Sequence, residues 1–96
     1  MYSRYLSLGS SPDNRAAAEQ IADKVYSHIK GLDGFVSVHF IISEDQTEYG
    51  SFSLWESKEQ AEAGGATIQA LVKEDLQAIA SGPPVIKLYE VYKPKG

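Results

Sequence analysis

The chain has 96 residues and a mass of 10.5 kDa, which suffices for one domain and is too little for two. Its composition, 43% hydrophobic and 23% charged, is that of an ordinary globular domain and excludes a disordered or collagen-like chain. Nine Lys and Arg against thirteen Asp and Glu give a formal net charge of -4, the wrong sign for binding nucleic acid or an anionic membrane surface. We predict one domain over residues 1–96, with a flexible tail at 93–96.

Several residue types and segments are missing from the sequence. There is no cysteine, which excludes disulfides, thiolate metal sites and a cysteine nucleophile. No apolar run approaches the roughly 20 residues that cross a bilayer. The polar start at Met1 lacks the hydrophobic core of a signal peptide. We therefore expect a cytoplasmic protein that does not bind a membrane.

The first half of the chain predicts a strand, a helix and a second strand. Tyr2–Leu8 alternates as a strand does. Ser11 and Pro12 then suit the start of an amphipathic helix of about five turns, and glycines at positions 31 and 34 end it. Phe35–Ile42 is rich in β-branched and aromatic residues, which is typical of a buried strand.

The second half predicts a hairpin strand, an interrupted helix and a last strand. A polar connection at 44–48 leads into the strand Tyr49–Trp55. The spacing from Ser57 to Gln60 is that of a capping box, so a short helix should begin there and stop at Gly64-Gly65. A second helical stretch runs from Ile68 to Ile79, and Val85–Tyr92 is the last strand. The second helix is therefore expected to be split.

The order β-α-β-β-α-β predicts an α+β, ferredoxin-like fold, in which a four-stranded antiparallel sheet carries both helices on one face. The other face would then expose a large apolar patch unless something covers it. We expect a second copy to cover it by two-fold symmetry, which makes a homodimeric α/β barrel. The side chains assigned to that apolar face are Leu6, Leu8, Val36, Val38, Phe40, Ile42, Phe52, Leu54, Ile86 and Leu88.

Trp55 is taken to point toward the helices, and strand alternation then places further side chains beside it. Small serines next to aromatic rings leave volume, while hydroxyls and an imidazole supply directed hydrogen bonds, a combination that suits a flat aromatic or other small hydrophobic ligand. The alternative is that the serines merely let the helices pack closely on the sheet. The side chains assigned to this face are Tyr5, Ser7, Ser37, His39, Tyr49, Ser51, Ser53 and Tyr89.

Two stretches resemble a known family. The segment from Tyr49 to Ala61 and the ending from Gly82 to Val91 are similar to antibiotic-biosynthesis-monooxygenase domains of the dimeric α/β-barrel superfamily. Members include cofactor-independent oxygenases of quinols and polyketide aromatics. The resemblance implies that Trp55 matches a tryptophan that lines a pocket between sheet and helices. The histidine that binds iron in heme-degrading members has no counterpart between Trp55 and Pro83.

His39 is the candidate general base, because it alone on the pocket face exchanges a proton near neutral pH; the alternative is a hydrogen-bonded interior histidine. Neither His39 nor His28 has a partner at metal-ligand spacing, so we predict no metal and no cofactor. Arg4 and Lys87 interrupt strand patterns and are expected to form an ion pair or extend to solvent at a sheet edge, with a catalytic role as the lesser alternative. The candidate site comprises His39 and Trp55 as catalytic residues, with Tyr5, Ser37, Ser51, Ser53 and Tyr89 binding the substrate.

Two functions remain open from the sequence. The first is a homodimeric, metal-free monooxygenase in which His39 deprotonates a quinol or aromatic substrate, Trp55 and Tyr5 wall its ring, and a serine binds its oxygen. The second is a non-catalytic dimer that uses the same cavity to bind a small hydrophobic metabolite or a partner protein.

Overall fold

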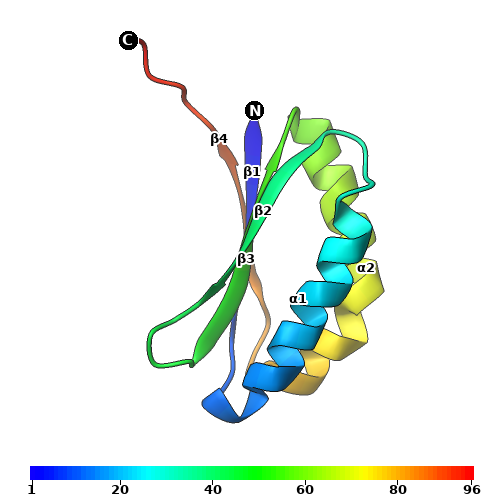
Figure 1. Ribbon diagram of the computed structural model, residues 1–96, viewed down its shortest axis with the longest axis vertical. Coiled ribbons are helices and arrows are strands. Elements are labelled where there is room, and N and C mark those ends of the chain that lie inside the picture. The colour runs from blue at the N-terminus through cyan, green and yellow to red at the C-terminus, as the bar shows by residue number, and fades with distance from the viewer.

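A computed structural model describes residues 1–96, and its four strands form one antiparallel sheet in the order β2-β3-β1-β4. Both helices lie on one side of this sheet (Figure 1), which confirms the ferredoxin-like α+β arrangement. Neither helix is long and apolar enough to cross a membrane. The elements are β1 (Tyr2–Gly9), the short 3-10 turn η1 (Pro12–Asn14), α1 (Arg15–Ile29), β2 (Phe35–Ile42), β3 (Glu48–Trp55), α2 (Lys58–Ile79) and β4 (Val85–Glu90).

The second helix is continuous, so the prediction of a split helix was wrong. Its start agrees with the capping-box spacing, because the Ser57 hydroxyl accepts a hydrogen bond from the Gln60 backbone N–H at 3.2 Å. Gly64 and Gly65 are buried within the helix and do not end it. A glycine in a helix interior costs only about 1 kcal/mol relative to alanine, and packing against the sheet outweighs that cost here.

These two glycines let α2 approach the sheet closely. A Cβ atom built on Gly64 would overlap the six-membered ring of Trp55, and one built on Gly65 would overlap the side chain of Arg4. The bare backbone at each position thus makes room for one large side chain that rises from the sheet. The glycines mark a close contact between helix and sheet.

The pairing register shows which side chains share a face, since residues directly opposite one another in adjacent strands point the same way. Tyr2 lies opposite Trp55, and Leu6 lies opposite Ser51. We call the side toward α1 and α2 the helix face and the other side the open face. The helix face carries Tyr2, Arg4, Leu6, Leu8, Val38, Phe40, Ile42, Tyr49, Ser51, Ser53, Trp55, Ile86 and Leu88.

The orientation predicted for β3 is correct, whereas those predicted for the other three strands are wrong. Tyr49, Ser51 and Ser53 share the helix face with Trp55, and Phe52 and Leu54 point to the open face. Leu6, Leu8, Val38, Phe40, Ile42, Ile86 and Leu88 were expected on the open face but lie on the helix face. Tyr5, Ser7, Ser37, His39 and Tyr89 were expected on the helix face but lie on the open face.

The physical reason lies in the pattern of the strands. The alternating set of β2 with Val38, Phe40 and Ile42 is wholly apolar, and it was assigned to the face that a second copy would cover, whereas it packs toward the helices. In addition, β2 has a register shift between Phe35 and Ser37, so that Phe35 faces the helices with its ring edge-on to Trp55. On β1, a buried arginine occupies the helix face, and this reverses the assignment that polarity alone suggests.

The core is divided into two clusters along the helix face. One surrounds the fully buried Trp55 and draws on Val25, Ile68 and Val72 of the helices. The other joins Leu6 and other residues near the far end of β1 to the end of α2. The cavity described below lies along residues of both clusters.

We predict that Gly64→Ala destabilises the fold by about 1–3 kcal/mol, the range typical of overpacking a core. Alanine normally stabilises a helix, but here its methyl group would push against a buried indole that has no room to move. Urea unfolding followed by circular dichroism measures the change. Gly82→Ala is the matched control, because nothing lies within 4 Å of a Cβ at that position. Equal stability of the two variants would contradict the close contact.

Candidate functional site

A cavity of about 150 Å³ lies between the helix face of the sheet and the two helices. Its walls come from β1, β2 and β3 below and from α1 and α2 above. Near their connecting hairpin, β2 and β3 bend away from α1 (Figure 1). Fourteen of its nineteen lining residues are hydrophobic, so the cavity favours an apolar guest over water. The polar and charged lining residues are Arg4, Glu19, Ser51 and Gln69, with the hydroxyl-bearing Tyr49 beside them.

Arg4 is the charged group set deepest in this wall. It lies on the helix face of β1 with only 8% of its surface exposed, and Gly65 of α2 leaves room for its stem. Its Nη2 donates a hydrogen bond to Oε1 of Gln69 at 3.4 Å, one helical turn beyond Gly65. Strand β1 and helix α2 together therefore fix the guanidinium at the cavity wall.

No carboxylate neutralises this guanidinium. The ion pairs of the protein are Arg15–Glu19, Lys24–Asp75 and Lys58–Glu62, so the expected ion pair of Arg4 is absent. Burial lowers the pKa of Arg4 from its ordinary value, because the charged form loses hydration. An arginine titrates so far above neutrality that it stays protonated here, and the cavity wall holds a largely desolvated positive charge.

The remaining polar groups are already engaged or lie near the surface. The Tyr49 hydroxyl donates to the Ser11 carbonyl at 2.7 Å. Glu19 is an exposed residue of α1 whose Oε2 accepts from Nε of Arg15 at 3.3 Å. The hydroxyl of Ser51 forms no hydrogen bond within the protein. Arg4 and Ser51 are thus the polar side chains of the sheet with capacity left for a guest.

Trp55 lies next to this cavity and is part of the core. It is fully buried, and its Nε1 donates to Oγ of Ser53 at 2.9 Å. The Ser53 hydroxyl in turn donates to the carbonyl of Arg4 at 3.3 Å. This chain of bonds ties the indole to the backbone of β1 at the residue that carries the guanidinium. Trp55 therefore supports the cavity wall and does not line it.

The structure separates the residues that the sequence assigned to one site. Ser51 lines the cavity, and Ser53 and Trp55 lie beside it in the core. His39 is exposed on the open face opposite Phe52, so it cannot reach a ligand on the helix face. Ser37, Tyr5 and Tyr89 also lie on the open face, where Tyr5 packs against Phe52 with ring centroids 6.3 Å apart.

A second hollow lies on that open face. It measures about 140 Å³ and is lined in part by Tyr5, Ser7 and Glu48. It lacks His39, Ser37 and Tyr89, and it is far less apolar than the cavity under the helices. The open face therefore does not reassemble the predicted site.

The site predicted from the sequence does not include Arg4, for which a catalytic role was only the lesser alternative. A signal was present, because an arginine between apolar strand positions needs compensating space, and Gly64-Gly65 in a helical pattern supplies it. Because these glycines were interpreted as the end of a helix, their role in making space for Arg4 was not predicted. Gln69, which follows one turn later, had no sequence signal of its own.

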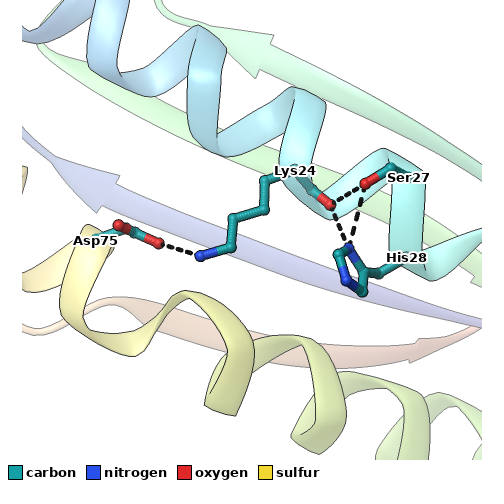
Figure 2. Close-up of polar contacts among 4 residues, drawn as sticks. All are labelled: Lys24, Ser27, His28 and Asp75. Atoms are coloured by element: carbon teal, nitrogen blue, oxygen red, sulfur yellow. Dashed lines mark hydrogen bonds and ion pairs between the residues drawn. The ribbon is translucent and has the colours of Figure 1, made fainter.

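The two helices over the cavity are joined at their outer surface. Figure 2 shows Lys24 of α1 extending to Asp75 of α2, with Nζ and Oδ2 3.0 Å apart. His28 lies one turn further along α1, where its Nδ1 is 2.9 Å from the Lys24 carbonyl and 3.2 Å from the Ser27 hydroxyl. His28 is exposed. No group of three or more His, Asp or Glu side chains is arranged to hold a metal ion.

Comparison with solved structures identifies the fold. A candidate antibiotic biosynthesis monooxygenase from Nitrosomonas europaea superposes with a TM-score of 0.84 at 13% identity, covering 99% of this chain and 93% of that one. SnoaB, a cofactor-independent oxygenase from Streptomyces nogalater, gives 0.76 at 14% identity, covering 97% and 95%. A Streptomyces coelicolor monooxygenase in complex with nanaomycin D gives 0.71 at 21% identity, covering 99% and 88%.

These neighbours confirm that the domain resembles antibiotic biosynthesis monooxygenases in fold. No family model matches the chain, and no curated protein matches its sequence. At such low identity the likeness is one of architecture, and one architecture hosts many chemistries. The function must therefore be argued from the cavity.

We predict that Arg4→Met stabilises the fold by about 1 kcal/mol, because an apolar side chain replaces a buried charge that lacks an ionic partner. Methionine keeps much of the arginine stem that packs over Gly65. The midpoint of urea unfolding measures the change, with Arg15→Met on the exposed surface of α1 as the control. A clear loss of stability in Arg4→Met would mean that the guanidinium holds the fold together.

Proposed function

We propose that the protein is a small-molecule monooxygenase that oxidises a quinol or another electron-rich aromatic substrate without a bound cofactor. The cavity under the helices carries this proposal, because it offers an apolar space beside a desolvated charge. The names of the structural neighbours, among them a cofactor-independent oxygenase and a monooxygenase in complex with nanaomycin D, support the same class of reaction.

Oxidation of the substrate by O₂ requires little from the protein beyond an apolar cavity beside a positive charge. The substrate anion donates an electron to O₂, and the resulting pair combines to form a carbon–oxygen bond and a peroxide. The peroxide takes up a proton, and loss of water from the H–C–O–OH group leaves a carbonyl. One phenol and one O₂ thus give one quinone and one water. An enzyme promotes such a reaction by binding the anion in a dry site and stabilising its charge.

Different residues of the cavity would exclude water, bind the substrate and accept its proton. Leu6, Val25 and Val72 are among the apolar groups that exclude water from the ring of the substrate. The Ser51 hydroxyl, which has no partner within the protein, can bind a substrate oxygen. The proton leaves to solvent or to Glu19 at the cavity wall, and His39 takes no part because it lies on the other side of the sheet.

Binding without turnover is the second candidate. The cavity contains no histidine, and its one carboxylate is exposed and paired with Arg15. A domain that only sequesters a small hydrophobic metabolite would need the same apolar walls and no proton acceptor. Oxygen consumption separates the two functions.

We propose in addition that a second copy of the chain covers the open face. Both helices lie on the other side of the sheet and no other element crosses the open face (Figure 1). Its apolar side chains are well exposed, with Ile41 at 42%, Phe52 at 42%, Val85 at 49% and Tyr89 at 45%. Covering such a patch is favourable at about 25 cal/mol per Å² of apolar surface, and two-fold symmetry makes the patch its own partner.

The catalytic proposal is tested by recording oxygen uptake with a panel of quinols and hydroxylated polycyclic aromatics. We expect uptake above the protein-free rate, and we expect Ser51→Leu and Ala22→Leu, which fill the cavity from the sheet and from α1, to lower it at least about tenfold. Circular dichroism confirms that these variants fold.

His28→Ala, on the exposed surface of α1, is the control and should stay within about twofold of the wild type. His39→Gln should also keep its activity. Loss of activity in His39→Gln with an intact assembly would contradict this site. No uptake with any substrate, together with tight binding of one of them, would favour the binding function.

The dimer is tested by light scattering at micromolar concentration. We expect twice the mass of one chain, and we expect Phe52→Glu to give a folded monomer, because a carboxylate would be buried in the centre of the interface. Tyr26→Glu, at an exposed aromatic residue of α1, should remain dimeric. A monomeric wild-type protein would exclude the second copy as the cover of the open face.

A further inference from the structure

We propose that the cavity binds its aromatic ligand as an oxyanion and that the Arg4 guanidinium is the group that holds the charged oxygen. This inference deepens the proposed function and rests on the cavity being the substrate site. It narrows the substrate class to aromatic acids, meaning compounds that carry an acidic phenol or a carboxylate on the ring system.

The first observation is an uncompensated charge. Arg4 has only 8% of its surface exposed, and it lies in the wall of a predominantly apolar cavity. All ion pairs of the protein involve other residues. A charge removed from water without a partner is strongly unfavourable, and a ligand that brings the opposite charge removes that cost when it binds.

The second observation is the supply of free donors. A guanidinium carries five N–H donors in a planar fork that matches a carboxylate or a phenolate. Only one hydrogen bond from the Arg4 side chain is formed, to Gln69 at 3.4 Å, which is long for such a bond. Every fully enclosed side-chain nitrogen in the protein has a partner, so the unused donors of Arg4 are not sealed inside the protein, and Arg4 is a lining residue of the cavity.

The third observation is that α2 has a glycine, a poor helix former, at the position where it packs against the Arg4 side chain. Any residue with a Cβ at position 65 would meet the stem of Arg4 around Cδ, Nε and Cζ. The residue opposite Arg4 on β3 is the small Ser53, and the next one along the same face is Ser51. Space around the guanidinium is thus kept open from the helix and from the sheet alike.

The other groups that face this space are compatible with an anion. Ser51 can donate its hydroxyl hydrogen to the same oxygen, and Gln69 holds the guanidinium from the helix side. Glu19 is the one acidic lining residue, and it is exposed and engaged with Arg15. Arg4 is therefore the one buried charged residue among those that line the cavity.

This arrangement has a chemical consequence for a phenolic substrate. A nearby cation favours the ionised form of a phenol and lowers its pKa, commonly by about 1–3 units. The phenolate is the form that gives an electron to O₂. Arg4 would therefore both select the substrate and raise the fraction of it that is reactive.

The test uses one matched pair of ligands and one phenol, and it requires no turnover. A naphthoate is compared with the matching naphthamide, which has the same shape and no charge, by fluorescence titration at neutral pH. Para-nitrophenol is titrated in the presence of the protein, and its visible absorbance reports the pKa of the bound phenol. The carboxylate and phenol arms show which oxyanion the site prefers.

We expect the wild type to bind the naphthoate at least about tenfold more tightly than the naphthamide, the factor that corresponds to 1.4 kcal/mol. Arg4→Gln should bind both equally and should return the pKa of bound para-nitrophenol toward its value in solution. Arg4→Lys should keep part of the preference, because the charge remains while the planar fork is lost. Lys58→Gln removes an exposed cation of α2 that takes no part in lining the cavity and should behave as the wild type.

The test distinguishes a wrong role for Arg4 from a wrong assignment of the cavity as the ligand site. If Arg4→Gln keeps the preference for the naphthoate, or if the wild type shows none, the assignment of Arg4 is wrong while the cavity remains a ligand site. If neither compound binds the folded wild-type protein, the cavity is not a site for aromatic ligands, and the proposed function falls with the inference. Binding of the naphthamide to folded Arg4→Gln shows that its cavity is intact.

Discussion

The contact between α2 and the sheet at Gly64 and Gly65 determines the rest of this structure. At this point the indole of Trp55 and the stem of Arg4 rise from neighbouring strands into space that any side chain on the helix would fill. The indole completes the core on one side, while the guanidinium reaches the cavity on the other. One pair of glycines thus positions both the hydrophobic anchor and the buried charge.

The same contact holds the Arg4 guanidinium in a buried position, where its charge lowers the stability of the fold relative to an apolar side chain. An apolar residue in place of Arg4 would give a more stable core, because burying a cation without an ionic partner is unfavourable. Functional sites commonly retain such unfavourable groups, because a charge aimed into a dry space is useful only if nothing in the protein neutralises it. In this chain the thirteen acidic residues are placed so that none pairs with Arg4.

The fold could be predicted from the sequence, whereas most of the site could not. Helix periodicity, turn residues and element order were sufficient for the ferredoxin-like arrangement and for the orientation of Trp55. The faces of β1, β2 and β4 were not, because both sides of the sheet carry large apolar side chains and because a bulge in β2 and a buried arginine on β1 break the simple alternation. The reversed face of β2 placed His39 on the wrong side of the sheet, and the reversed face of β1 left Arg4 out of the site.

We place the ligand site on the helix face, around Arg4. A crystal structure of the protein soaked with the naphthoate is the sharpest test of this placement. We expect the ring between the sheet and the two helices, with the carboxylate on the Arg4 guanidinium and within reach of the Ser51 hydroxyl. A naphthoate bound instead on the open face beside His39 and Tyr89 would contradict it.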